Sequence, residues 1–197
     1  MLDALDALIR LVERLSRRLA GLAGVVLIGM VLLISLEIVM RRTIGHSPGL
    51  SFEYSGYVLG ITASWSFAYA LFHKAHIRID AAYVRFSARG RLVLDLLALA
   101  AFTAFAVMAA QAAFGVLTET IARDSVSNTP LHTPMWIPQV LWAAGWLWFA
   151  FATLLLFVRV ALAAVTGDAE TVRRLAGSST LDEQIEEEAL NLKEQGS

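Results

Sequence analysis

Four long apolar runs divide the chain. They cover residues 20–40, 54–72, 92–117 and 139–165, and charged residues gather in the segments between them. Each run has roughly the 20 apolar residues that an α-helix needs to cross the hydrocarbon core of a bilayer. The pattern therefore predicts an all-α integral membrane protein, with four transmembrane helices in one membrane domain over residues 20–165.

Two basic segments outside these runs also show a helical period. Residues 1–19 place apolar side chains on one face (Leu5, Leu8, Val12, Leu15, Leu19) and charged side chains on the other. This pattern predicts an N-terminal amphipathic helix that lies in the membrane interface.

The segment between the second and third runs predicts a second interfacial helix. Its basic stripe consists of Arg78, Arg85 and Arg89, with apolar residues on both sides of the stripe. We expect these arginines to contact lipid headgroups. The two apolar faces are compatible with a helix held between lipid and a second protein surface, and also with an interfacial helix that has no partner.

Composition changes again after the last run. Residues 166–197 are polar and end in the acidic stretch "TLDEQIEEEALNLKEQGS". Such a segment has too few apolar residues to form a packed core, so we expect a flexible, acidic tail on the cytoplasmic side.

The overall composition supports a membrane protein and narrows its chemistry. The chain is 57% hydrophobic and its mean hydropathy is +0.63, which is more apolar than a typical soluble domain. It contains no cysteine. Disulfides, thiolate-bound metal clusters and covalently attached haem are therefore excluded.

The distribution of positive charge predicts the orientation. Thirteen of the sixteen Lys and Arg residues lie in the N-terminal segment, the segment between the second and third runs, or the C-terminal part; the other three are Arg41, Arg42 and Arg123. Loops rich in Lys and Arg remain in the cytoplasm. We therefore expect both termini to be cytoplasmic.

The runs themselves look like packing surfaces. In the second run, small residues recur every four positions at Gly56, Gly60, Ser64 and Ala68, a spacing that lets another helix approach closely. The neighbour can be another helix of this chain or a helix of a partner. Deep in the fourth run, we expect the side chains of Trp146 and Trp148 to face lipid or a neighbouring protein.

Few residues within the runs could carry chemistry. We expect Glu37 to pair with Arg41, and Asp95 with Arg91, each one helical turn apart. The chain has no P-loop pattern and no evident nucleophile–base pair or carboxylate dyad. It therefore does not look like an enzyme, and it lacks the midplane ionisable groups of a secondary transporter's binding site.

The four histidines raise the alternative of a haem-bearing membrane anchor of a respiratory enzyme. His46 and His132 fall in outer connections, whereas His73 and His76 fall at the inner end of the second run. Haem with two histidine ligands needs facing imidazoles inside a bundle, and this placement disfavours it. A self-assembling small exporter is another alternative, in which Glu37 would have to bind cations.

One stretch carries a family resemblance. Residues 72–97, "FHKAHIRIDAAYVRFSARGRLVLDLL", resemble the signature of the small membrane subunit of tripartite ATP-independent periplasmic (TRAP) transporters, the DctQ type. The matching positions are His76, Ile77 and Asp80. Upstream, "RRTIGHSPGLSFEYSGY" is similar to the first outer loop of that family. Arg41 and Glu53 match there, whereas Arg42, Leu50 and Phe52 depart from the family pattern.

The resemblance implies a non-catalytic subunit in the bacterial inner membrane. This subunit would brace a large, elevator-type TRAP subunit during sodium-coupled uptake of an organic acid that a periplasmic binding protein delivers. The implied partners are these two proteins and the phospholipid membrane, with no nucleic acid and no cofactor in this chain.

The matched residues then receive expected structural roles. Glu53 would stabilise the start of the second helix through its dipole, or pair with Arg41 across the outer loop. His76 and Asp80, four residues apart, would hydrogen-bond the turn that leaves the second helix. Gly56 and Gly60 would belong to a packing or partner interface.

Overall fold

The computed structural model describes residues 2–47, 49–73 and 87–176, and almost all of them are helical. The helices are α1 (Leu2–Thr43), α2 (Leu50–Phe72), α4 (Ala88–Ala122), α5 (Trp136–Val165) and α6 (Ala169–Ala176). Extended pairing in the described part is limited to one isolated bridge, Val126–Pro134, between α4 and α5. The all-helical prediction is confirmed.

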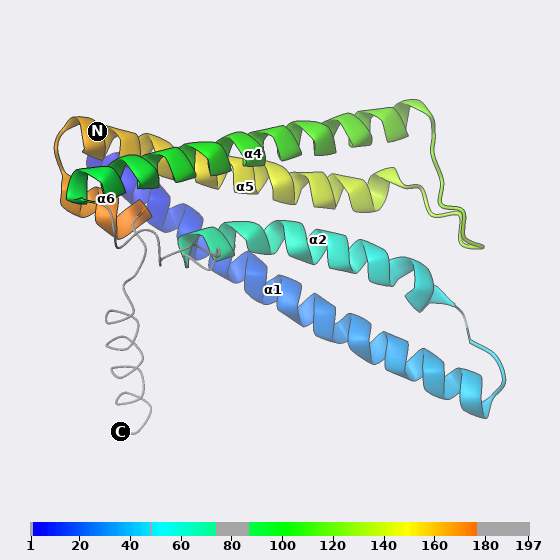
Figure 1. Cartoon of the computed structure of the whole chain (residues 1–197). Coiled ribbons are helices and arrows are strands. Elements are labelled where there is room, and N and C mark those ends of the chain that lie inside the picture. The colour runs from blue at the N-terminus through cyan, green and yellow to red at the C-terminus, as the bar shows by residue number, and fades with distance from the viewer. Residues whose placement is uncertain (1, 48, 74–86, 177–197) are drawn as a thin grey trace, which may run out of the picture.

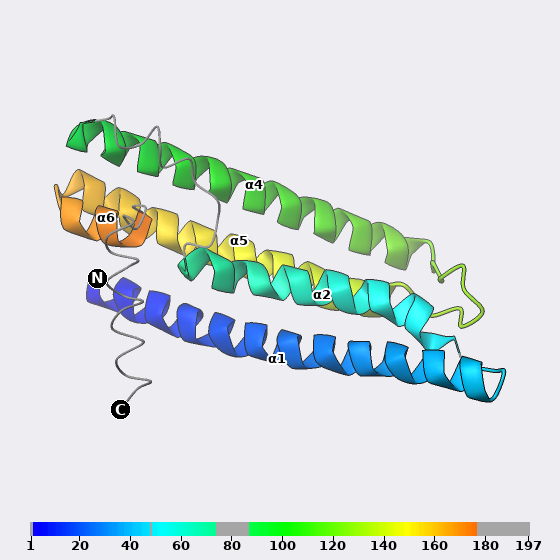
Figure 2. The same cartoon turned by 60° about the horizontal axis from the view of Figure 1, so that its bottom comes forward.

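The four long helices lie side by side in a row rather than in a closed bundle. The order across the row is α1, α2, α5, α4 (Figures 1 and 2). The main contacts join α1 to α2, α2 to α5 and α5 to α4, and α1 makes a smaller contact with α5. Helix α5 is thus the central element, and α1 and α4 form the two edges.

Helix α1 continues without a break through the expected boundary at residue 19. Its buried residues include Ile9, Ser16, Ala23, Met30 and Glu37. Because these residues recur every seven positions, close to two helical turns, they form one seam along the helix. The predicted N-terminal helix and the first predicted span are therefore one element. At about 1.5 Å per residue it is roughly 63 Å long, about twice the thickness of a hydrocarbon core.

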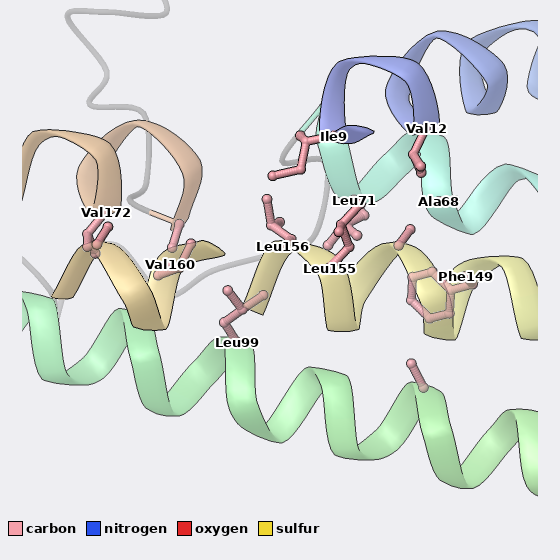
Figure 3. Packing of buried hydrophobic residues seen from close by; sticks show 14 residues of the cluster. Ile9, Val12, Ala68, Leu71, Leu99, Phe149, Leu155, Leu156, Val160 and Val172 are labelled. Atoms are coloured by element: carbon pink, nitrogen blue, oxygen red, sulfur yellow. The ribbon is translucent and has the colours of Figure 1, made fainter. Parts of the chain in front are cut away.

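The packed face of the N-terminal part also differs from the expected one. Ile9 and Val12 are buried, whereas Leu8 and Leu15 remain 38% and 36% exposed. The packed side chains belong to one cluster with residues of α5, α2 and α6 (Figure 3). The helical period alone could not distinguish the two apolar faces, since only packing against α5 selects one of them.

The core lies around α5 in the half of the row that holds the N-terminus and α6, which we call the inner half, and the opposite half the outer one, after the orientation expected from the sequence. Phe149, Leu156 and Val160 of α5 are fully or almost fully buried. They pack in one cluster with buried residues of the neighbouring helices, namely Ile9, Val12, Ala68, Leu71, Leu99 and Ala106 (Figure 3).

Helix α6 was not expected, because residues 166–197 were predicted to be a flexible tail. Asp168 caps its start by accepting a hydrogen bond from the Thr171 N–H at 3.0 Å. Val172 and Ala176 are each 1% exposed, and α6 packs on both α4 and α5. A short capped helix with one apolar face is stable here because that face is covered. Residues 177–197 lie outside the described residues.

Three helices, α1, α4 and α5, are long and apolar enough to cross a membrane by length and composition. Helix α2, the predicted second span, is not among them, because its 23 residues include several glycines, serines and tyrosines. The helices also extend beyond the predicted runs. For example, α4 begins at Ala88, after Ser87, whose Oγ accepts a hydrogen bond from the Gly90 N–H.

Helices α2 and α5 are in close contact at Ser64 and Gly145. A Cβ atom at Gly145 would lie 2.2 Å from Ser64 Oγ and 3.0 Å from the Ser64 carbonyl carbon. The inner half of the small-residue pattern, Ser64 and Ala68, is therefore buried within this chain. The outer half is open: an added Cβ would meet nothing within 4 Å at Gly56 and only Trp142 at Gly60.

Candidate functional site

Glu53, in the first turn of α2, joins α2 to the connection between α4 and α5. Its side chain is buried, with the residue 6% exposed. The Tyr57 hydroxyl donates to Glu53 Oε1 at 2.9 Å from one turn further along α2. The Thr129 hydroxyl donates to Glu53 Oε2 from the α4–α5 connection. One carboxylate therefore holds two segments that are 76 residues apart in the sequence.

The surroundings of Glu53 favour its ionised form. Burial acts to raise its pKa, but hydrogen bonds from Thr129, Thr133, Ser127 and Tyr57 more than offset burial and lower the pKa to about 2. The carboxylate is thus charged at any physiological pH, and its negative charge is stabilised by hydroxyl groups rather than by a cation. The expected pairing of Glu53 with Arg41 is not what the structure shows.

The α4–α5 connection is a small hairpin that presents these hydroxyl groups. The Ser127 N–H donates to the Thr133 carbonyl at 2.9 Å, and the Met135 N–H donates to the Ser125 carbonyl at 3.0 Å. Ser127 Oγ lies 2.7 Å from Thr129 Oγ1. We call residues 123–135 the outer hairpin. Its backbone bonds fix the positions of the hydroxyl groups that Glu53 accepts from.

Glu37 performs a second fastening role, from α1 to the start of α2. Its Oε1 accepts hydrogen bonds from the N–H groups of Leu50 at 2.7 Å and Ser51 at 3.3 Å, and its Oε2 accepts one from the Ser51 hydroxyl at 2.6 Å. The cap position of α2 is Gly49, which has a φ of 73° and no capping side chain. Glu37 therefore supplies from another helix the acceptor that the cap residue lacks.

The expected pairing of Glu37 with Arg41 is also replaced. Arg41 Nη2 donates to Ser47 Oγ at 3.3 Å, and Arg41 forms no ion pair with any described residue. The sequence spacing suggested a partner one turn away, whereas the partners of Glu37 lie 13 and 14 residues further along the chain.

At the inner end, Arg159 of α5 and Asp6 of α1 form a two-pronged ion pair. Arg159 Nε lies 2.7 Å from Asp6 Oδ1, and Arg159 Nη2 lies 3.2 Å from Asp6 Oδ2. The Arg159 side chain is only 6% exposed. Its hydrogen bond lowers the pKa of Asp6 below the usual value of 3.8. This pair was not predicted from the sequence, although Arg159 is the one charged residue in the fourth apolar run.

The two deep tryptophans are partly buried, and each also contacts other residues of this chain. Trp148 Nε1 donates to Ser16 Oγ of α1 at 3.0 Å, and Ser16 is fully buried. The Trp146 ring packs against Phe67 of α2 at a centroid distance of 5.0 Å and against Phe149 at 6.1 Å. Both tryptophans therefore fasten α5 to its neighbours.

Several predicted site residues lie outside the described residues, namely His76, Arg78, Asp80 and Arg85. Arg89 lies in the first turn of α4, and its side chain is not described. Gly56 and Gly60 line a cleft of about 190 Å³ between α2 and α5, together with Tyr57 and Trp142.

The histidines of the described part are not gathered. His46, His73 and His132 are exposed, and His73 Nδ1 lies 3.0 Å from the Tyr69 carbonyl oxygen. No group of three or more metal-ligating side chains occurs within residues 2–47, 49–73 and 87–176.

Comparison with known proteins gives one family. The family model described as "Tripartite ATP-independent periplasmic transporters, DctQ component" matches residues 30–163. Neither the curated proteins nor the solved structures give a match.

Proposed function

The chain belongs to the DctQ family of TRAP transporter components, and from this premise we propose that it is a non-catalytic small subunit that braces the large membrane subunit. The large, elevator-type subunit would carry out sodium-coupled uptake of an organic acid that a periplasmic binding protein delivers. Membership of a tripartite system implies both partners, and it gives no support to the haem-bearing anchor.

One observation carries the bracing role: ionisable side chains at both ends of the row fasten helices to one another. Glu37 and Glu53 hold the outer end of α2 to α1 and to the outer hairpin. The Asp6–Arg159 pair holds α1 to α5 at the inner end. A subunit that positions another protein needs such rigid cross-links.

The orientation is part of the proposal. Helix α2 lies between α1 and α5 and contacts both, which supports α2 as a fourth span even though its composition is less apolar. Four spans place both termini on the same side, and the thirteen basic residues predict that this side is the cytoplasm. We retain an interfacial position for the segment between α2 and α4 as part of this proposal, whereas the N-terminal residues continue α1 beyond the span and do not lie in the interface as a separate helix.

The open glycines of α2 are the surface that we assign to the large subunit. At Gly56 an added Cβ would meet nothing within 4 Å, so the small residue is not needed for packing within this chain. Small residues in membrane helices permit close contact with another helix. A helix of the large subunit would use this space.

The test is purification of the tagged full chain from its own membranes in gentle detergent, followed by mass spectrometry of the intact complex. We expect one larger polytopic protein in fixed stoichiometry. Gly56→Leu should weaken that association, whereas Gly29→Leu, at an equally open position on α1, should leave it intact. A homo-oligomer or a haem-containing complex would overturn the proposed function, whereas an intact complex with Gly56→Leu would refute only the assigned surface.

A further inference from the structure

Arg41 has a positive charge at the outer end of α1 that no carboxylate of the described residues contacts. Among the described residues, its side chain makes one long hydrogen bond, 3.3 Å, to the neutral Ser47 hydroxyl. The nearest candidate, Glu37, uses both carboxylate oxygens on Leu50 and Ser51. A guanidinium has five N–H donors in a planar fork that suits phosphate, so most of its binding capacity remains available.

The guanidinium borders a cleft of about 280 Å³ between the outer parts of α1 and α2. Its polar lining residues are Glu37, Arg41, Ser51 and Ser55, and its apolar ones are Ile34, Ile38 and Phe52. Ile38 is 63% exposed and Phe52 is 84% exposed. Ile34 lies seven residues before Arg41 on α1, about 10 Å deeper at 1.5 Å per residue.

From this arrangement we propose that the cleft binds one phospholipid of the outer leaflet. Its phosphate contacts Arg41, and the upper part of one acyl chain lies along Ile34, Ile38 and Phe52. The Arg41 guanidinium selects an anionic group at the end of α1, and Ile38 and Ile34, about one and two turns deeper on α1, select a molecule that continues into the hydrocarbon. Glu37 also lines the cleft and interacts electrostatically with Arg41, but both of its carboxylate oxygens accept hydrogen bonds from Leu50 and Ser51.

Arg42 provides a matched comparison. It carries the same charge at the next position on α1 and is also exposed, but it does not line the cleft. Successive residues of an α-helix point about 100° apart, so of these two arginines it is Arg41 that faces the space between α1 and α2. The inference rests on the spans and the orientation of the proposed function, since α1 and α2 must cross the bilayer with the N-terminus in the cytoplasm, but not on the role of the chain in transport.

The experiment uses the full chain, purified with whatever subunits accompany it, in phosphatidylcholine vesicles. A small fraction of phosphatidylglycerol with a photoactivatable group in one acyl chain serves as the probe. Labelled residues are located by peptide mass spectrometry. We expect labelling to concentrate at Ile34, Ile38 and Phe52, compared with Ile28 and Leu32, which are similarly exposed on α1.

Loss of one phosphate contact near a membrane surface corresponds to a decrease of about fivefold in labelling. We expect that decrease in labelling for Arg41→Gln, little change in labelling for Arg42→Gln, and labelling close to that of the native chain for Arg41→Lys. Equal labelling in Arg41→Gln and Arg42→Gln, or uniform labelling along α1, would overturn the inference. Displacement of the probe by inorganic phosphate would assign the site to a free anion, and crosslinking of the cleft to a partner subunit would assign it to protein; either result also refutes it.

Discussion

At the residue scale, Glu53 makes the most concentrated set of interactions. Its negative charge is stabilised by hydroxyl donors from α2 and from the outer hairpin. Replacing the carboxylate with an amide changes one acceptor oxygen into a donor, so the side chain can no longer accept from the Tyr57 and Thr129 hydroxyls at the same time. A single isosteric substitution therefore tests whether the outer hairpin depends on α2.

We expect Glu53→Gln to loosen the outer hairpin without preventing membrane insertion. Amide hydrogen exchange at Ser127 and Met135, whose N–H groups bond within the hairpin, should accelerate in the variant. Glu119→Gln is the control, because Glu119 forms an exposed ion pair with Arg123 and is itself 60% exposed. Unchanged exchange in Glu53→Gln would show that the hairpin holds its shape alone.

Lowering the pH should weaken the same contact in the native chain, because it protonates the Glu53 carboxylate. The pKa of Glu53 is about 2 in the folded protein and about 4.5 ordinarily. Its contribution to stability is therefore fully present above pH 4.5 and is lost as the pH falls toward 2. Asp6 shifts in the same direction. Thermal unfolding followed from pH 6 to pH 2 should show a declining midpoint, and the decline should be smaller in Glu53→Gln. An equal decline of the midpoint in the native chain and in Glu53→Gln would show that Glu53 does not contribute to this pH dependence.

Substitution of Gly145 tests the close contact between Gly145 of α5 and Ser64 of α2. Gly145→Ala would place a methyl group 2.8 Å from Ser64 Cβ, and such overpacking typically costs about 1–3 kcal/mol. The paired substitution Gly145→Ala with Ser64→Gly removes two of the three close atoms and should recover part of the loss. Unfolding by SDS titration measures each variant. Gly29→Ala, at an open position, should be close to neutral.

At the element scale, α1 shows what the sequence could and could not reveal. The apolar run 20–40 was correctly assigned to a helix, and the preceding residues were also predicted to be helical. Their continuity was missed because composition changes at residue 19 while the helical period does not. The seam from Ile9 to Glu37 became visible only through the neighbours that bury it.

The same limit explains the missed contacts of the candidate site. The family resemblance singled out Glu53, but its partner Thr129 is 76 residues away. Arg159 and Asp6 are 153 residues apart. Sequence spacing identifies partners one turn away on the same helix, and this is why Glu37 was wrongly paired with Arg41. The start of α6 was missed because the acidic residues that follow it dominate the local composition.

The Asp6–Arg159 pair should stabilise the contact between α1 and α5. Asp6→Asn leaves the buried guanidinium without its carboxylate, and we expect a loss of about 1–3 kcal/mol in the free energy of unfolding. Arg17→Gln is the control, because Arg17 pairs with Glu13 at the surface with 63% exposure, where such pairs contribute less than about 1 kcal/mol. SDS titration compares the two, and equal losses would contradict a special role for the inner pair.

At the scale of the whole molecule, the orientation can be tested directly because the native chain has no cysteine. Single cysteines at Asp3, Asn128 and Thr166 would occupy exposed positions near the N-terminus, in the outer hairpin and after α5. In intact cells with a permeabilised outer membrane, a membrane-impermeant maleimide should label only Asn128→Cys. Labelling of Asp3→Cys or Thr166→Cys would contradict cytoplasmic termini and the four-span proposal.

The row of four helices has a mechanical consequence. A row of helices that contact their neighbours resists shear within its own plane and bends more readily across that plane. The cross-links at its outer and inner ends oppose sliding of one helix past another. A moving protein mounted against such a row would be guided along the direction in which the row yields least.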